Sequence, residues 1–128
     1  MTRDLIMIAV FGAAGAVCRY GVSGWIQTRA SDFPYGTLTV NVAGCFLLGA
    51  LMHVGLSTTL VPPIWRTALA IGFLGGMTTF STFSYETICL LEEGNWGSAA
   101  GNVALSVGLG LTAVWAGLAA ARAITGGA

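Results

Sequence analysis

Long apolar runs separated by short polar stretches dominate the chain. Four such runs cover about residues 5–26, 37–56, 64–91 and 96–124. An α-helix of about 20 mostly apolar residues is long enough to cross the ~30 Å hydrocarbon core of a bilayer. The pattern therefore predicts an all-α integral membrane protein, with four transmembrane helices in a single domain over residues 1–128.

Turn-forming residues mark the ends of the predicted helices. The polar stretch over residues 27–36 separates the first two helices, and Pro62 and Pro63 separate the second from the third. Pro63 suits the first turn of the third helix, where a missing N–H costs no hydrogen bond. Further along, Gly94 can end the third helix and Asn95 can cap the fourth.

The composition supports a membrane location. Of the 128 residues, 55% are hydrophobic and only 8% are charged, whereas a soluble domain carries about 25% charged residues. The mean hydropathy is +0.82. The net charge is zero and the chain has no basic run, which argues against nucleic-acid binding and against a polybasic lipid anchor.

Few side chains offer catalytic or metal-binding chemistry. Cys18, Cys45 and Cys89 lie in apolar runs without C-x-x-C spacing, and we interpret them as small buried side chains. The single histidine, His53, falls near the end of the second helix, where we expect it at the membrane interface. No nucleophile or acid lies near it in the sequence, so we predict that the protein is not an enzyme.

The arginines give little indication of orientation in a membrane. With four crossings, Arg3, Arg66 and Arg122 fall on the side that holds both termini, and Arg19 and Arg29 fall on the other. Such a small difference barely biases insertion. Charge counting therefore leaves two arrangements open: one fixed orientation with the Arg3 side inside, or insertion both ways and pairing of inverted copies.

Glycines are spaced to place small residues on one face of a helix. Three groups share this spacing, in the first, third and fourth predicted helices: Gly12 and Gly15; Gly72 and Gly76; and Gly97, Gly101 and Gly108. Small faces let helices approach closely in lipid. We interpret these faces as packing surfaces and assign them no chemistry.

The third predicted helix carries the most unusual segment, Gly75-Gly76-Met77-Thr78-Thr79-Phe80-Ser81-Thr82-Phe83-Ser84-Tyr85-Glu86. Its glycines and hydroxyl residues are weaker helix formers than Ala or Leu, and they fall near the middle of the run. We predict a break there, at mid-membrane, that frees carbonyl oxygens around residues 75–78. Such oxygens suit a small cation such as Na⁺, and an inverted partner would complete a site of four carbonyls.

Hydroxyl groups are dense in the same segment. Thr78, Thr82 and Glu86 follow i, i+4, i+8 spacing and are expected on one helical face. Single Ser or Thr residues in a membrane helix commonly bond to the helix backbone or to a neighbouring helix. So dense a run, together with a carboxylate inside a predicted span, favours a functional role.

Two phenylalanines and an amide complete the set of candidate ligands. Phe80 and Phe83 are interleaved with the hydroxyls, and Asn41 lies about one turn into the second helix. Hydroxyls and amides donate hydrogen bonds, and the edges of aromatic rings carry partial positive charge. A path of these groups without lysine suits a small anion that accepts strong hydrogen bonds. The residues predict a small-anion path but do not by themselves identify the anion.

Three motifs resemble the Fluc/CrcB family of fluoride channels. They are the twelve residues over 75–86, the stretch Gly36-Thr37-Leu38-Thr39-Val40-Asn41, and the pattern Gly12-x-x-Gly15-x-x-x-Arg19-Tyr20. The resemblance covers the whole chain, including its length and number of helices. It implies passive, selective export of fluoride across the bacterial inner membrane, which relieves fluoride toxicity. It also implies an antiparallel, dual-topology homodimer with two pores.

The resemblance further implies a role for each matching residue. The ring edges of Phe80 and Phe83 would contact fluoride, and Asn41 would hydrogen-bond along the pore. A polar track would consist of Thr37, Thr79, Ser81, Thr82, Glu86 and Ser106. The backbone carbonyls of Gly75 and Thr78 would hold a structural Na⁺ at the dimer interface, and Arg19 would lie near the vestibule. Asn102 and Gly110 stand where a Tyr and a Ser can stand in the family.

Two other functions fit a small four-helix membrane protein. A dual-topology, proton-coupled exporter of the small multidrug type would carry a carboxylate in the middle of its first helix. Here the first helix has no acid after Asp4, and Glu86 lies late in the third. The remaining alternative is a packing subunit of a larger complex, which would show no transport on its own.

Overall fold

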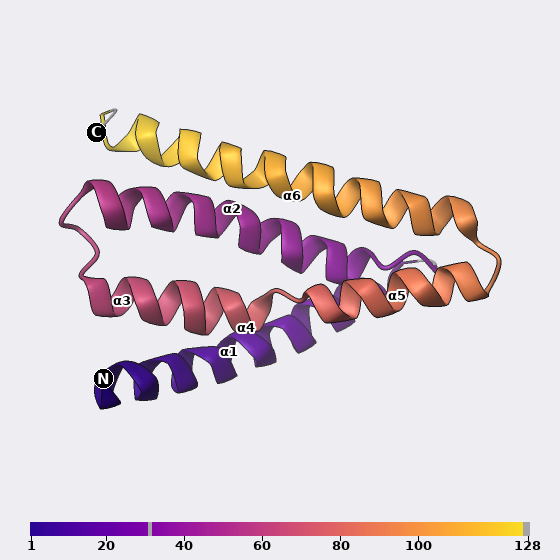
Figure 1. Cartoon of the computed structure of the whole chain (residues 1–128), viewed down its shortest axis with the longest axis horizontal. Coiled ribbons are helices and arrows are strands. Elements are labelled where there is room, and N and C mark those ends of the chain that lie inside the picture. Colours follow the sequence, from indigo (N-terminus) through magenta and orange to yellow (C-terminus); the bar gives the residue numbers. More distant parts are fainter. Residues whose placement is uncertain (31, 127–128) are drawn as a thin grey trace.

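The computed structural model describes residues 1–30 and 32–126, and these residues form helices joined by short connections (Figure 1). Three helices are long and uninterrupted: α1 (Thr2–Gln27), α2 (Tyr35–Ser57) and α6 (Trp96–Ile124). Between α2 and α6 the chain forms four shorter pieces, which are α3 (Pro63–Thr67), the π-helical segment η1 (Ala68–Leu74), α4 (Gly75–Met77) and α5 (Phe80–Glu92). The described residues contain no β-strand.

The chain crosses the length of the bundle four times. Both termini and the α2–α3 connection lie at one end, and the α5–α6 turn lies at the opposite end (Figure 1). The pieces α3, η1, α4 and α5 follow one another along the third crossing. This arrangement agrees with the even number of crossings expected from the sequence.

Most predicted boundaries agree with the observed helices within two or three residues. The last helix begins at Trp96 and ends at Ile124 as predicted, and Pro63 occupies the first turn of α3. Gly94 adopts a left-handed conformation with φ of 76°, and the Asn95 side chain caps α6 by accepting a hydrogen bond from the Ser98 N–H. The predicted turn at residues 92–95 is therefore confirmed.

Three of the helices, α1, α2 and α6, are long and apolar enough to cross a membrane. The third crossing differs because its longest α-helical piece, α5, has only 13 residues. Its chain is interrupted after Met77. There, Thr78 and Thr79 adopt extended backbone conformations, with ψ angles of 155° and 118°.

The interruption changes which side chains share a face. We expected Thr78, Thr82 and Glu86 on one helical face, and that expectation is wrong for Thr78. Thr78 precedes α5 in extended conformation, and its hydroxyl donates back to the Leu74 carbonyl over 2.9 Å. Only Thr82 and Glu86 follow helical spacing within α5.

Glycines bring helix backbones into direct contact at several crossings. A Cβ atom on Gly15 of α1 would overlap the Phe73 carbonyl oxygen in η1, and one on Gly76 would lie 2.5 Å from the Gly12 carbonyl oxygen. On the other side of the bundle, a Cβ atom on Gly117 of α6 would overlap the Phe46 carbonyl oxygen of α2. No side chain larger than hydrogen fits at these crossings.

The predicted packing face of the fourth helix makes no close contact within the chain. A Cβ atom on Gly97 or Gly108 would meet no atom within 4 Å, and one on Gly101 would meet only the Phe33 ring, 3.8 Å away. The close contact with α2 is made by Gly117 instead. A stripe of small residues thus identified a face of α6, but not the face that packs within the chain.

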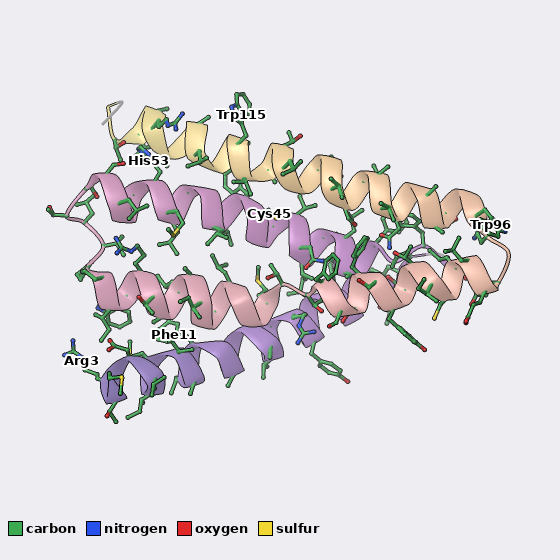
Figure 2. All side chains as sticks on the ribbon, in the orientation of Figure 1. Arg3, Phe11, Cys45, His53, Trp96 and Trp115 are labelled. Atoms are coloured by element: carbon green, nitrogen blue, oxygen red, sulfur yellow. The ribbon has the colours of Figure 1, made fainter. Side chains whose placement is uncertain are left out.

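The expectation that His53 lies at the membrane interface stays a prediction, and the expectation that the cysteines are buried is wrong. His53 is only 8% exposed; it lies between α2 and α6, and its Nε2 atom is 3.2 Å from the Thr125 hydroxyl (Figure 2). The histidine is therefore buried in a contact between helix ends. The three cysteines are half-buried rather than buried, and all are free thiols.

Candidate functional site

A cavity of about 340 Å³ lies beside the interrupted third crossing. It is bounded by α2, by the residues around the interruption and by the middle of α6. Seven of the residues singled out from the sequence line it: Asn41, Gly75, Thr78, Thr79, Phe80, Phe83 and Ser106. The fold therefore brings together residues from three separate crossings.

Asn41 holds the interruption in place. Its Nδ2 group donates to the Thr79 carbonyl over 2.9 Å, and its Oδ1 atom accepts from the Thr79 N–H over 2.7 Å. One side-chain amide thus satisfies both backbone groups of an extended residue, as a neighbouring β-strand would. Membrane-embedded backbone has no water to serve as an alternative partner. The second N–H of the Asn41 amide remains available for another acceptor.

Hydroxyl groups cluster at the beginning of α5. The Thr79 hydroxyl oxygen accepts a hydrogen bond from the Thr82 N–H over 3.2 Å, which caps the helix. The same hydroxyl donates to the Thr82 hydroxyl over 3.0 Å and lies 3.3 Å from that of Ser81. The cap satisfies one of the unpaired N–H groups of the first helical turn, and the cluster places three hydroxyls side by side.

Arg19 contacts the other side of the interruption. Its Nε–H donates to the Gly76 carbonyl over 3.1 Å, at the C-terminal end of α4, where cations are favoured. Arg19 also lines a smaller cavity of about 180 Å³ together with Thr37, Thr79 and Thr82. This second cavity lies on the α1 side of the interruption and combines a guanidinium with hydroxyl groups.

Thr37 and Glu86 connect α2 to α5. The Thr37 hydroxyl, on a side chain that is 7% exposed, donates to Glu86 Oε1 over 2.7 Å. Among the described residues, Glu86 Oε2 is buried and has no hydrogen-bond partner. Glu86 is thus held at one oxygen. The residue also lines a third cavity of about 270 Å³ together with Asp32 and Glu93.

The two phenylalanines lie against one another at the mouth of the main cavity. Their ring centroids are 5.5 Å apart and their planes meet at 48°. Phe80 is 79% exposed, whereas Phe83 is only partly exposed. A large aromatic side chain so exposed on the chain alone leaves room for another molecule, or another copy, to cover it.

Sequence reasoning did not single out Thr87, which connects the site to α6. Thr87 donates to the Phe83 carbonyl over 2.8 Å and accepts from the Asn102 amide over 2.9 Å. Asn102 is 2% exposed and, in the part of the chain that the structure describes, is the largest fully buried side chain. The signal was present in the sequence: Thr87 lies four residues after Phe83, and an amide inside a predicted span requires a partner.

The fold and these cavities define the class of protein. It is a multi-pass helical membrane protein with polar groups gathered beside an interrupted crossing. The sequence matches the family described as "CrcB-like protein, Camphor Resistance (CrcB)" over residues 6–118, and the chain belongs to this family.

Curated relatives match almost the whole chain. Proteins named "Fluoride-specific ion channel FluC" from Geobacter metallireducens and Geobacter sulfurreducens are 53% and 55% identical to it, over 92% of this chain and 96% of theirs. The protein of the same name from Geotalea daltonii is 53% identical over 95% of this chain and 99% of its own length. These names describe an ion channel and not an enzyme.

Proposed function

We propose that the chain forms a passive, fluoride-selective channel that exports fluoride from the bacterial cytoplasm across the inner membrane. The observation that carries this proposal is the main cavity, where Phe80, Phe83, Asn41 and Ser106 converge. Among the described residues that line the cavity there is no Lys, Arg or carboxylate. The names of the relatives support the same function.

The chemistry of the lining suits fluoride better than a larger halide. Fluoride loses a strongly bound hydration shell on entering the membrane, and donors must replace it. The free N–H of Asn41, the Ser106 hydroxyl and the ring edges of Phe80 and Phe83 can each contribute a weak donor. Because none of these groups carries a full charge, the ion is not trapped and can leave again.

The conducting unit in this proposal is an antiparallel homodimer with two pores, in which the interrupted third crossings meet at mid-membrane. Three features support it. Phe80 is 79% exposed on the chain alone, this exposed ring lines the main cavity, and the arginines barely bias insertion. A second, inverted copy would cover Phe80 and close the cavity.

A structural Na⁺ at the centre of this dimer fits the backbone carbonyl oxygens around the interruption. Gly75 and Thr78 both line the main cavity, and the carbonyls of Gly76 and Thr79 are already occupied by Arg19 and Asn41. The described residues contain no cluster of three or more His, Cys, Asp or Glu. Neutral carbonyls of Gly75 and Thr78 from two copies would supply a small, hard cation with oxygen ligands.

Fluoride efflux from liposomes tests the function directly. Vesicles that contain the purified chain and are loaded with KF should release fluoride when valinomycin lets K⁺ follow, and matched KCl vesicles should retain chloride. Imposing a proton gradient should not change the rate, which separates a channel from a proton-coupled exporter. Equal chloride efflux would overturn the selectivity, and no efflux from the purified chain would favour a packing subunit.

Replacing the phenylalanines should reduce conduction without unfolding the protein. In Phe80→Ile or Phe83→Ile the apolar bulk remains but the ring edge is lost, and we expect fluoride efflux to fall about two- to tenfold, since an aromatic contact contributes about 0.5–1.5 kcal/mol. Tyr85→Ile is the matched control: Tyr85 is 71% exposed on the same helix and does not line the main cavity. Unchanged efflux in both phenylalanine variants would refute their role.

Removing sodium should destabilise the dimer. If Na⁺ binds only the assembled protein, a concentration 100 times its Kd adds about 2.7 kcal/mol to stability. We therefore expect purified protein to melt at a lower temperature in choline chloride or KCl than in NaCl at equal ionic strength. Melting temperatures that do not depend on the cation would contradict the sodium site. They would not bear on the proposal that the protein conducts fluoride.

A further inference from the structure

Asn102 is the most deeply buried polar side chain near the main cavity. It is 2% exposed and lies on the face of α6 that packs against α5. Its Nδ2 group donates to the Thr87 hydroxyl over 2.9 Å, and its Oδ1 atom lies 3.5 Å from the Ser106 hydroxyl. The amide therefore stands between a residue of α5 and a residue that lines the cavity.

The hydrogen bonds in this group have a direction. The Thr87 hydroxyl donates its only proton to the Phe83 carbonyl over 2.8 Å, so its oxygen accepts from Asn102. The Oδ1 atom of the Asn102 side-chain amide is then left to accept the proton of Ser106. In this direction Ser106 directs its proton toward α6 and has only lone pairs to offer to the cavity. Lone pairs do not stabilise an anion.

The direction can be reversed without leaving a group unpaired. A half-turn of the Asn102 amide about its terminal side-chain bond exchanges its oxygen and its nitrogen. The Thr87 hydroxyl then donates to the amide oxygen, while the Phe83 carbonyl keeps the backbone bond of its helix. The amide nitrogen now donates to Ser106 and frees the Ser106 proton to point into the cavity.

We propose that Asn102 is a positioning residue for conduction: its reversible amide lets Ser106 become a hydrogen-bond donor when an anion occupies the cavity. This proposal rests on the proposed function. An anion in the cavity accepts from Ser106 and so stabilises the reversed direction, because hydrogen bonds to a charged group are the stronger ones. When the ion leaves, the groups return to the first direction.

A double-mutant cycle in fluoride efflux tests the proposal. Asn102→Leu keeps the shape of the side chain and removes both its donor and its acceptor, so that no amide N–H orients Ser106 and its hydroxyl bonds back to the backbone carbonyl of residue 102 in its own helix. Ser106→Ala removes the donor itself. Each should lower efflux about tenfold, as expected for one hydrogen bond to a charged group. If Asn102 acts through Ser106, the double variant should be no slower than either single variant. A roughly hundredfold loss in the double variant would mean independent roles and overturn the proposal.

Thr87→Val separates positioning from packing. It cuts the same α5–α6 hydrogen bond as Asn102→Leu, but it leaves the amide with Ser106 as its partner. Buried N–H groups are left unpaired more rarely than carbonyls, so the amide nitrogen should turn toward Ser106. We expect efflux within about twofold of wild type. A tenfold loss would show that the bond between the helices matters and not the orientation of Ser106.

The outcomes remain interpretable if one variant fails. Should Asn102→Leu not yield a single dimeric species in gel filtration, the comparison of Thr87→Val with the double variant Thr87→Val/Ser106→Ala still decides. The first should conduct and the second should not exceed Ser106→Ala alone. Wild-type efflux of Asn102→Leu would overturn the positioning role, whereas the absence of fluoride efflux in wild type would overturn the proposed function itself.

Discussion

Asn41→Leu is expected to abolish fluoride efflux and to destabilise the folded protein at the same time. The amide of Asn41 satisfies both the N–H and the carbonyl of Thr79, and leucine can satisfy neither. An unpaired buried polar group costs about 1–3 kcal/mol. Because Thr79 is only partly buried, we expect the lower end of this cost for each of its two groups, which lowers the free energy of unfolding by about 2 kcal/mol in total. We expect fluoride efflux to fall about 100-fold or more.

The two readouts distinguish the possible roles of Asn41. If it acted only as a ligand for the ion, Asn41→Leu would lower efflux but leave the melting temperature in detergent unchanged. If it holds the interruption, both should fall together. Thr39→Val is the matched control, because Thr39 lies on the same helix and is exposed; both its efflux and its melting temperature should equal those of wild type. Normal melting of Asn41→Leu would refute the holding role.

The four crossings could be predicted from the sequence because they depend on local properties. Run length and turn formers such as Pro63, Gly94 and Asn95 determine where a helix can begin and end, and those residues act within a few positions of themselves. Weak helix formers around residue 78 also indicated where the third crossing would depart from a regular helix. That it departs by two extended residues, preceded by a π-helical segment, is not a local property.

The contacts that stabilise the interruption are between distant residues. Arg19 and Gly76 are 57 positions apart, and Asn41 and Thr79 are 38 apart. The sequence indicated that Asn41 needed a partner, but an amide can satisfy a backbone, a side chain or an ion equally well. Only the packing of α2 beside the interruption determines that it meets Thr79.

Glycine spacing shows the same limit. In α1 and the third crossing the predicted small faces do meet, because Gly15 and Gly76 lie where the backbones come closest. In α6 the spacing of Gly97, Gly101 and Gly108 is similar, yet a Cβ atom on Gly97 or Gly108 would meet nothing within 4 Å, and one on Gly101 would meet only the Phe33 ring. Periodicity identifies a face that permits close approach, but the neighbour that uses it depends on the whole arrangement.

Gly117→Ala should therefore disrupt the fold, although alanine is the better helix former. Among the described residues, no pair of helical elements packs more extensively than α2 and α6. A Cβ atom on Gly117 would overlap the Phe46 carbonyl oxygen and lie 3.0 Å from the Ala50 nitrogen. Both obstacles are backbone atoms, so no side chain can turn away to make room. The two helices would have to separate, and we expect a loss of about 3 kcal/mol, the upper end for overpacking.

Gly21→Ala provides the opposite expectation from the same chemical change. A Cβ atom on Gly21 of α1 would meet no atom of the chain within 4 Å, and alanine is favoured over glycine inside a helix by about 1 kcal/mol. The free energy of unfolding, measured by SDS titration and circular dichroism, should then be well below that of wild type for Gly117→Ala. For Gly21→Ala it should equal or exceed that of wild type. Equal stability of the two variants would mean that α2 and α6 can separate at little cost, and that their direct backbone contact does not hold the bundle together.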